Sequence, residues 1–205
     1  MNAQGKRSGE TAREYAYRMI REQVISLELK PGEAFNDMEF AAKIGVSRTP
    51  VREAVIQLSE ESRIIEIFPQ RGMRIAPIDV ELVEEARSLR VLLEKQIAGM
   101  CCEMATEEDI KWLQENVGLQ EFYMENSRPE MVMQLDDEMH HKLFMICHRE
   151  LTYGMCQKLA IHYDRIRSLS VNTVKDNTII EDHRKIIQFI AEHKKKMPWP
   201  RWKSI

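Results

Sequence analysis

The chain has 205 residues, of which 43% are hydrophobic and 31% charged, and its formal net charge at pH 7 is −3. This is the composition of an ordinary soluble protein. No apolar run approaches the ~20 residues that a membrane-spanning helix needs, and the polar start MNAQGKRSGE does not resemble a secretory signal. The four cysteines show no CxxC spacing, which favours free thiols in a reducing compartment. We therefore expect a cytoplasmic protein without a membrane partner.

The charge is distributed unevenly along the chain. Residues 1–77 contain 12 lysines and arginines against 11 aspartates and glutamates, whereas the remainder contains 18 against 22. This asymmetry has the sign expected of a DNA-binding head on an acidic body, but it is small. The charge balance alone is therefore weak evidence for DNA binding.

The first predicted elements are two helices. Residues 12–27 place apolar side chains at helical spacing, which predicts an amphipathic helix. After a Pro-Gly turn, we expect Asn36 to cap a short helix over residues 37–44. Gly45 should end that helix, because its position requires a left-handed backbone conformation.

A third helix and a hairpin follow. We expect Thr49 to be the N-cap and Pro50 the first helical residue, because a residue before proline avoids the helical region. Four apolar residues of this helix should face inward: Val51, Ala54, Val55 and Leu58. The stretch RIIEIFPQRGMRIAP (63–77) has two β-prone runs around a Pro-Gln-Arg-Gly turn, which predicts a β-hairpin. Three helices and a hairpin form a winged helix-turn-helix.

The rest of the chain is predicted to be helical. Asp79 and Thr106 are expected to cap the first two of the downstream helices. The predicted helical segments are 79–104, 106–125, 130–148, 152–169 and 177–193. The fold class is therefore mainly α, with a winged helix-turn-helix DNA-binding domain over residues 1–77 and an all-helical bundle over residues 78–205.

The stretch GVSRTPVREA (45–54) holds the residues that we expect to contact DNA. In a helix-turn-helix, the N-terminal residues of the second helix meet base edges in the major groove, and arginine to guanine is the commonest specific contact. Hydroxyl groups there can bind phosphates, and the arginines beside the wing glycine should lie near the DNA backbone. A capped helix with solvated arginines is the structural alternative. The predicted DNA-binding residues are Ser47, Arg48, Thr49, Arg52, Arg71 and Gly72.

Three features make this region resemble the GntR family of winged helix-turn-helix regulators. They are the PGE turn (31–33), the GVSRTPVREA core and the PQRGM wing (69–73). The resemblance implies a double-stranded DNA operator and places Ser47, Arg48, Thr49, Arg52 and Gly72 at positions that the family uses for DNA.

The chain departs from the family pattern at two places. Met38 stands where some relatives carry an arginine, which removes one phosphate or base contact. Ser62-Arg63 replaces the usual Gly-Leu after the recognition helix. We therefore expect a strained turn between that helix and the wing.

The downstream region resembles the FCD effector domain of the FadR-like branch of this family. The segments that carry the resemblance are EEARSLRVLLEKQIA (84–98), LDDEMHHKL (135–143), YDRIRSLS (163–170) and EDHRKIIQFI (181–190). It implies a divalent metal held by one aspartate and three histidines, with a small carboxylate effector beside it. His183 would be one of these ligands.

An aspartate and a histidine four residues apart lie on one face of a helix and can share a metal. Two such pairs compete, Asp136 with His140 and Asp137 with His141. His140 lies on the inward apolar stripe, which favours the first pair, as does the family pattern LDxxxHxxL. With His183, these ligands suit Zn²⁺, Ni²⁺ or Mn²⁺. A buried, hydrogen-bonded histidine is the structural alternative for His140.

Two arginines are candidates for binding the effector carboxylate. Arg90 lies on the first helix of the bundle, and an i,i+4 pair with Glu94 is its structural alternative. Arg165 is a further candidate of the same kind, as is Arg167.

Residues 194–205 (KKKMPWPRWKSI) do not continue the helical pattern. Similar FCD domains have a further helix here that supplies the last histidine. The three lysines imply an adenine-rich tract, and with plausible codons another reading frame encodes an amphipathic helix ending in a histidine near position 205. We predict that this segment is a frameshifted tail, so that the bundle lacks its last helix and the metal site is weakened by loss of a fourth ligand. A natural extension is the alternative.

Together these features predict a homodimeric, ligand-responsive transcriptional regulator. It would bind a short palindromic operator and control a catabolic operon in response to a small carboxylate. One alternative is a metal-dependent enzyme that uses the Asp/His cluster to activate water. Another is a regulator whose truncated C-terminal domain no longer responds to its effector.

Overall fold

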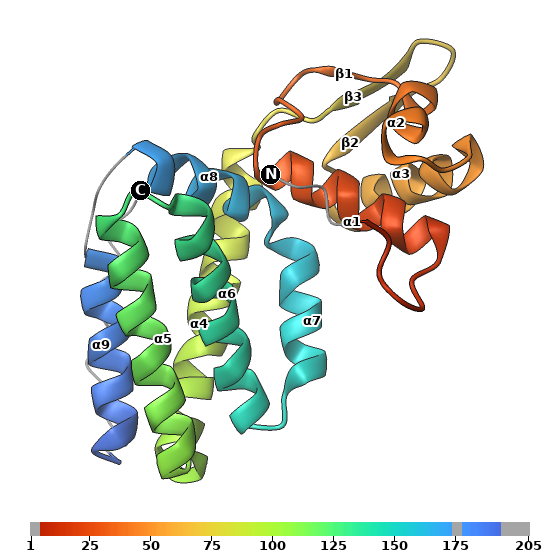
Figure 1. The fold of residues 1–205 in the computed structure, drawn as a ribbon. Helices are drawn as coiled ribbons and strands as arrows, with labels where there is room; N and C mark the ends of the chain where they lie inside the picture. The colour runs from red at the N-terminus through yellow and green to blue at the C-terminus, as the bar shows by residue number, and fades with distance from the viewer. Residues whose placement is uncertain (1–4, 174–177, 194–205) are drawn as a thin grey trace. The chain divides into compact units, whose positions relative to one another are not determined.

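The computed structural model describes residues 5–173 and 178–193, and these residues form nine α-helices and one three-stranded sheet (Figure 1). The mainly α fold class is confirmed. The chain divides into two compact units: unit 1 comprises Met1–Glu84 and Lys158–Arg165, and unit 2 comprises Glu85–Gln157 and Ile166–Ile205. Among the described helices, none is long and apolar enough to cross a membrane. The predicted tail, residues 194–205, lies outside the described residues.

The first two helices of unit 1 begin at side-chain caps. Helix α1 (Ala12–Ile25) starts after Thr11, which forms a reciprocal capping box with Glu14. Helix α2 (Asp37–Ile44) starts after Asn36, whose side chain accepts hydrogen bonds from two backbone N–H groups. It ends at Gly45, which has a left-handed φ of 74°. The predicted caps of the second helix are therefore confirmed.

Helix α3 (Arg48–Ser62) begins two residues earlier than the sequence predicts. Ser47, not Thr49, is its N-cap, and Pro50 is its third residue. The prediction is wrong because proline is tolerated through the first turn, where backbone N–H groups have no partner inside the helix. The apolar stripe Val51, Ala54, Val55 and Leu58 is fully buried, as predicted.

A small antiparallel sheet completes unit 1. Strands β2 (Ile65–Phe68) and β3 (Gly72–Ile75) form the predicted hairpin. Gly72 has a φ of 99°, which favours glycine at the wing turn. The short strand β1 (Ala34–Phe35) pairs with the other edge of β3. Two residues are too few to show strand alternation, so β1 had no signal in the sequence.

The sequence predicts a strained turn between α3 and β2, because Ser62-Arg63 replaces the usual Gly-Leu. The structure has a left-handed residue in this turn. Arg63 is the C-cap of α3, and its φ of 55° and ψ of 22° are left-handed. A residue with a Cβ pays about 1–2 kcal/mol in this region, where helices commonly place glycine.

The described chain after the wing is built from helices, and the cap of α5 by Thr106 and the cap of α4 by Asp79 are as predicted. Helix α5 packs against both α6 and α9. Buried apolar side chains from α4, α5, α6 and α9 form one core. The bounds are α4 (Val80–Met104), α5 (Glu107–Glu125), α6 (Pro129–Ile146), α7 (Glu150–Leu159), α8 (Ile161–Thr173) and α9 (Thr178–Ala191).

The predicted single helix over 152–169 is wrong. The structure forms two helices, α7 and α8, separated at Ala160. No glycine or proline marks this break, so the sequence pattern does not reveal it. The boundary between the two units falls inside α8, after Arg165. Neighbouring turns of this helix therefore pack in different units.

Replacing Arg63 by glycine should stabilise unit 1, because glycine adopts the left-handed conformation without the Cβ penalty. We expect Arg63→Gly to raise the free energy of unfolding by about 0.5–1 kcal/mol, measured by urea unfolding followed by circular dichroism. Arg63→Ala is the matched control, since it removes the same charge but keeps the penalty. Equal stabilities of the glycine and alanine variants would show that the turn is unstrained.

Candidate functional site

The N-terminus of α3 presents polar side chains to solvent. Ser47, Arg48, Thr49 and Arg52 are all exposed. The Ser47 hydroxyl makes no capping hydrogen bond, and the first turn contains no acidic residue. The first turns of α1, α2 and α5 each contain at least one carboxylate. The positive end of the α3 dipole is therefore not offset by a carboxylate of its own first turn.

The two arginines of α3 differ in their surroundings. The Nε of Arg48 lies 3.0 Å from the buried carboxylate of Asp37, the first residue of α2. This ion pair orients Arg48 and joins the two helices of the helix-turn-helix, while more than half of the Arg48 side chain stays exposed. Among the described residues, Arg52 has no such carboxylate partner. The exposed side chain of Arg52 is therefore available to contact an anion or a base edge.

The wing also presents one engaged and one exposed arginine. Arg74 on β3 pairs with Glu66 and lies over the ring of Phe68. Arg71 lies in the exposed turn next to Gly72. Of the two wing arginines, Arg71 is the better placed for a phosphate.

In unit 2, helices α6 and α9 bring Asp136, His140 and His183 together. Asp136 and His140 are one turn apart on α6, and all three residues are buried. The Oδ1 of Asp136 lies 3.4 Å from the Nε2 of His183, and its Oδ2 lies 3.8 Å from the Nε2 of His140. One ligand atom from each residue lies within 4.8 Å of the other two.

These three residues fit a divalent metal. Ligand atoms about 2.1 Å from a tetrahedral Zn²⁺ lie roughly 3.4 Å apart, which is close to the spacings here. The Nε2 atoms of His140 and His183, which face Asp136, have no hydrogen-bond partner among the described residues. Buried polar groups are rarely left in this state, and a missing ion is one recognised cause. Two buried histidines and a carboxylate are also the donor types that Zn²⁺, Ni²⁺ and Mn²⁺ accept.

A hydrogen-bonded chain on α5 orients His183. Its Nδ1 lies 2.9 Å from the Oε1 of Gln120, and the Nε2 of Gln120 donates to Asn116 at 2.7 Å. Asn116 in turn donates to the carbonyl of Leu135 at 3.1 Å. When Nδ1 donates to Gln120, the lone pair of Nε2 is directed towards Asp136. Burial lowers the pKa of His183 to about 4, so the ring is neutral and able to ligate near pH 7.

The sequence reasoning missed this chain on α5. Its signal was nonetheless present, because Asn116 and Gln120 share a helical stripe with the buried Leu113 and Val117. Polar residues on a core-facing stripe need buried partners.

Charged side chains surround the cluster. Glu94 on α4 lies 2.6 Å from the Nε of Arg90 and 2.9 Å from the Nδ1 of His140. Burial alone would raise the pKa of Glu94, but Arg90 and His140 outweigh it and lower the pKa to about 2. Arg167 on α8 pairs with Asp136, and Arg90 lies 3.6 Å from the same carboxylate. Burial opposes ionisation of Asp136 as well, yet Arg167 and the other cations hold its pKa below its usual range.

The competing register, Asp137 with His141, is separated in the structure. Asp137 pairs with Arg167 at 3.1 Å, and the ring of His141 stacks on Tyr153 at a centroid distance of 4.6 Å. Only the first register meets His183.

The two predicted effector arginines lie in different places. Arg90 lies in the cluster, where its Nε also makes the i,i+4 pair with Glu94. Arg165 does not, since it is fully buried in unit 1 and donates to the carbonyl of Ala76 at 2.9 Å. The other candidate, Arg167, reaches the cluster from the next part of α8.

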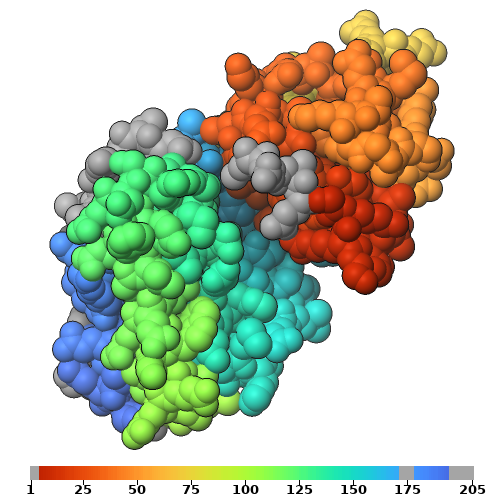
Figure 2. All heavy atoms as spheres, viewed as in Figure 1, coloured from red at the N-terminus to blue at the C-terminus, as the bar shows by residue number. Residues whose placement is uncertain are grey.

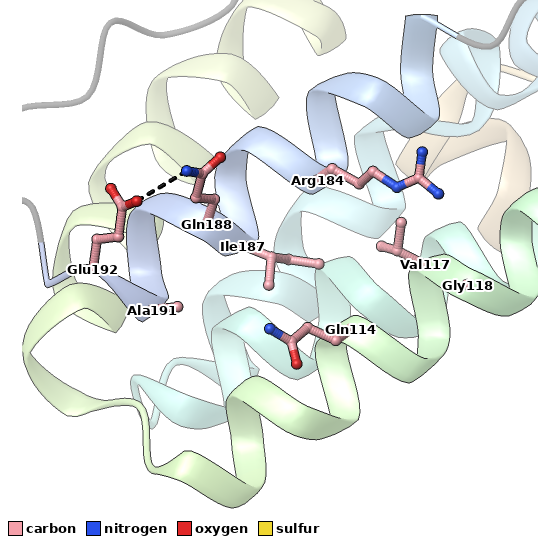
Figure 3. A pocket seen from close by; sticks show the side chains of 8 residues that line it. All are labelled: Gln114, Val117, Gly118, Arg184, Ile187, Gln188, Ala191 and Glu192. Atoms are coloured by element: carbon pink, nitrogen blue, oxygen red, sulfur yellow. Dashed lines mark hydrogen bonds between the residues drawn. The ribbon is translucent and has the colours of Figure 1, made fainter.

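A separate open groove of about 480 Å³ runs between α5 and α9 (Figure 3). Val117 and Ile187 form its apolar floor, and the side chains of Gln188 and Glu192 hydrogen-bond along its α9 side. None of the three clustered Asp/His residues lines it. The groove is therefore separate from the buried Asp/His cluster.

Comparison with known proteins places both units in described families. Residues 12–75 match the family "Bacterial regulatory proteins, gntR family", and residues 85–197 match the "FCD domain". The chain is 30% identical to the HTH-type transcriptional repressor RspR of Escherichia coli over 77% of its length and 69% of that protein. It is also 30% identical to an HTH-type regulator of Streptomyces ambofaciens, over 90% of this chain and 78% of the relative.

Among solved structures, E. coli McbR/YncC has a similar fold. The TM-score is 0.78 at 18% identity, with 90% of this chain and 88% of that chain covered. The matched families and relatives are transcriptional regulators, so the alternative of a metal-dependent enzyme is not supported.

Proposed function

Because the chain belongs to the gntR family of bacterial regulatory proteins and carries an FCD domain, we propose that it is an effector-controlled regulator of a catabolic operon. It binds a short palindromic operator through α3 and the wing. A small carboxylate bound at the Asp/His cluster changes its affinity for that operator. The observation that carries the proposal is the exposed N-terminus of α3, where two arginines meet a helix dipole without an acidic residue in the first turn.

In the proposed complex, Arg48 and Arg52 contact base edges, and Ser47 and Thr49 contact phosphates. Arg48 is oriented by Asp37, so its approach is fixed before DNA binds. Arg52 lies one helical turn further along the same face and is free to form a bidentate contact with guanine. Arg71 and the backbone at Gly72 contact the sugar-phosphate backbone. The base contacts give specificity, and the phosphate contacts give register and affinity.

In the FCD domain, Asp136, His140 and His183 are the proposed ligands of a divalent Zn²⁺, Ni²⁺ or Mn²⁺ ion. When bound, the ion supplies positive charge that attracts a carboxylate. Gln120 holds His183 in the ligating orientation. The carboxylate of Glu94, close to the Nδ1 of His140, orients that ring in the same way. Three protein ligands make a weaker site than four but leave positions for an effector. Arg90 is the proposed partner of the effector carboxylate.

A palindromic operator requires two DNA-binding heads, so we propose a homodimer. Helix α7 has no buried residue, and its apolar side chains Leu151 and Met155 are 82% and 64% exposed. Leu151 and Met155 are four residues apart and form an apolar stripe on one face of this helix. Figure 2 shows the side chains of α7, in cyan, as part of the molecular surface. We assign this stripe to the contact between the two copies.

Arg52→Ala should weaken binding to the cognate operator by about 1–3 kcal/mol and relax discrimination at one base pair per half-site. Fluorescence anisotropy with the operator and single-base variants measures both effects. Arg71→Ala is the comparison, since loss of a phosphate contact should weaken all duplexes more evenly. If Arg52→Ala binds the operator as tightly as the unaltered protein, the assignment of the base contact is wrong.

His140→Ala should abolish stoichiometric metal binding, because it removes one of three buried ligands. Metal analysis by mass spectrometry of protein purified without a histidine tag is the measurement. His141→Ala is the matched control and should keep its metal. The reverse pattern would move the site to the Asp137/His141 register.

Leu151→Arg should convert the dimer to a monomer, because an arginine would lie within the apolar stripe of α7. Sedimentation equilibrium gives the mass in solution. Leu119→Arg on α5 is the matched control, since Leu119 is also exposed, at 47%, but lies outside the stripe. A dimer that survives Leu151→Arg and is lost with Leu119→Arg would place the contact on α5.

A further inference from the structure

Asp136 serves two sets of partners at once. Its Oδ1 faces His183, whereas its Oδ2 is contacted by Arg167 and lies 3.8 Å from His140. Asp136 and Arg167 are both buried. The same carboxylate is therefore a proposed metal ligand and the partner of a buried cation.

These two roles oppose each other. A divalent ion among Asp136, His140 and His183 would share the carboxylate that Arg167 already neutralises. Like charges that close together repel strongly in a buried site, where water screens them poorly. The metal therefore binds more favourably when Arg167 releases Asp136.

Arg167 has a second acceptor in reach. While its Nη2 contacts Asp136, its Nη1 donates to the Oδ1 of Asp137 at 3.1 Å. The side chain of Asp137 is 44% exposed and does not belong to the cluster of Asp136, His140 and His183, so it is not a ligand in this arrangement. The planar fork of arginine can keep one carboxylate while it gives up the other.

We propose that Arg167 is an internal competitor of the metal: it neutralises Asp136 when no metal is bound and transfers to Asp137 when the metal binds. This inference rests on the proposed metal site and names a residue that sets its affinity. Asp137 is the receiving site for the displaced guanidinium. Metal affinity thus depends on two residues that do not touch the ion.

The direction in which one substitution changes the Zn²⁺ affinity distinguishes a competing role of Arg167 from a supporting role. If Arg167 only held Asp136 in the ligating orientation, its removal would weaken metal binding about tenfold to a hundredfold, as for other residues that orient ligands. If Arg167 competes with the metal, its removal strengthens binding. We expect Arg167→Met, which keeps an apolar stem of similar reach, to bind Zn²⁺ at least tenfold more tightly.

The measurement is the Zn²⁺ dissociation constant of tag-free, metal-free protein, obtained by competition with a chromophoric chelator. Arg184→Met is the matched control. Arg184 follows His183 directly on α9 and pairs with Glu121 at the surface, so this variant removes the same charge near the site without freeing Asp136. Its Zn²⁺ affinity should stay within threefold of that of the unaltered protein.

A second variant tests the transfer. Asp137→Asn should weaken Zn²⁺ binding severalfold, because it removes the charged acceptor to which Arg167 would transfer. In the double variant with Arg167→Met, the effect of Asp137→Asn should disappear, since no guanidinium remains to be received. This cycle also covers the case in which Arg167→Met fails to fold, because the half-exposed Asp137 can be replaced alone.

The outcomes distinguish this inference from the metal site beneath it. If neither the unaltered protein nor Arg167→Met binds Zn²⁺, both the proposed metal site and the proposed competition are wrong. If the unaltered protein binds Zn²⁺ and Arg167→Met binds equally or less tightly, the site stands and the competition is overturned. If Arg167→Met does not fold and Asp137→Asn binds as tightly as the unaltered protein, the competition is likewise overturned.

Discussion

The buried carboxylate of Asp136 is the constraint around which the centre of unit 2 is arranged. An ionised carboxylate in a protein interior costs several kcal/mol of desolvation unless cations and donors replace the lost water. Here Arg167 contacts it, Arg90 lies 3.6 Å away, and two histidine rings lie within 4 Å. Glu94 then balances the second arginine. These charged contacts join the helices that supply the groups, α4, α6, α8 and α9. Helices α4, α6 and α9 also share an apolar core.

The same need for charge balance explains why a regulator would keep arginine beside its proposed metal ligands. A protein that responds to a ligand must remain folded both with and without it. Removing one partner of a buried ion pair costs about 3–5 kcal/mol, which is a large part of the stability of a small domain. A cation supplied by the chain itself keeps Asp136 compensated when the metal is absent. In the proposed competition, the site exchanges one positive partner for another, and its affinity for the metal is set by the difference between them.

Local rules predicted most of unit 1 and fewer of the features of unit 2. Asn36, Gly45 and the stripe from Val51 to Leu58 obey capping and periodicity, which depend only on neighbouring residues. The start of α3 was misplaced because the pre-proline preference of Thr49 gave way to a proline-tolerant first turn. The break at Ala160 carries no glycine or proline, so tertiary packing alone decides it.

The candidate site shows the same division. Asp136 and His140 follow from helical spacing, and the structure brings them to His183 across 43 residues of sequence. Arg165 and Arg167 could not be ranked in advance, because the unit boundary in α8 lies between them. The guanidinium of Arg165 donates to backbone carbonyls in unit 1, whereas that of Arg167 pairs with two carboxylates in unit 2. Side chains two residues apart on a helix point about 200° away from each other. Arg165 and Arg167 therefore have different surroundings although they carry the same charge. Composition and charge do not predict which of the two arginines reaches the Asp/His cluster. The direction of each side chain decides it.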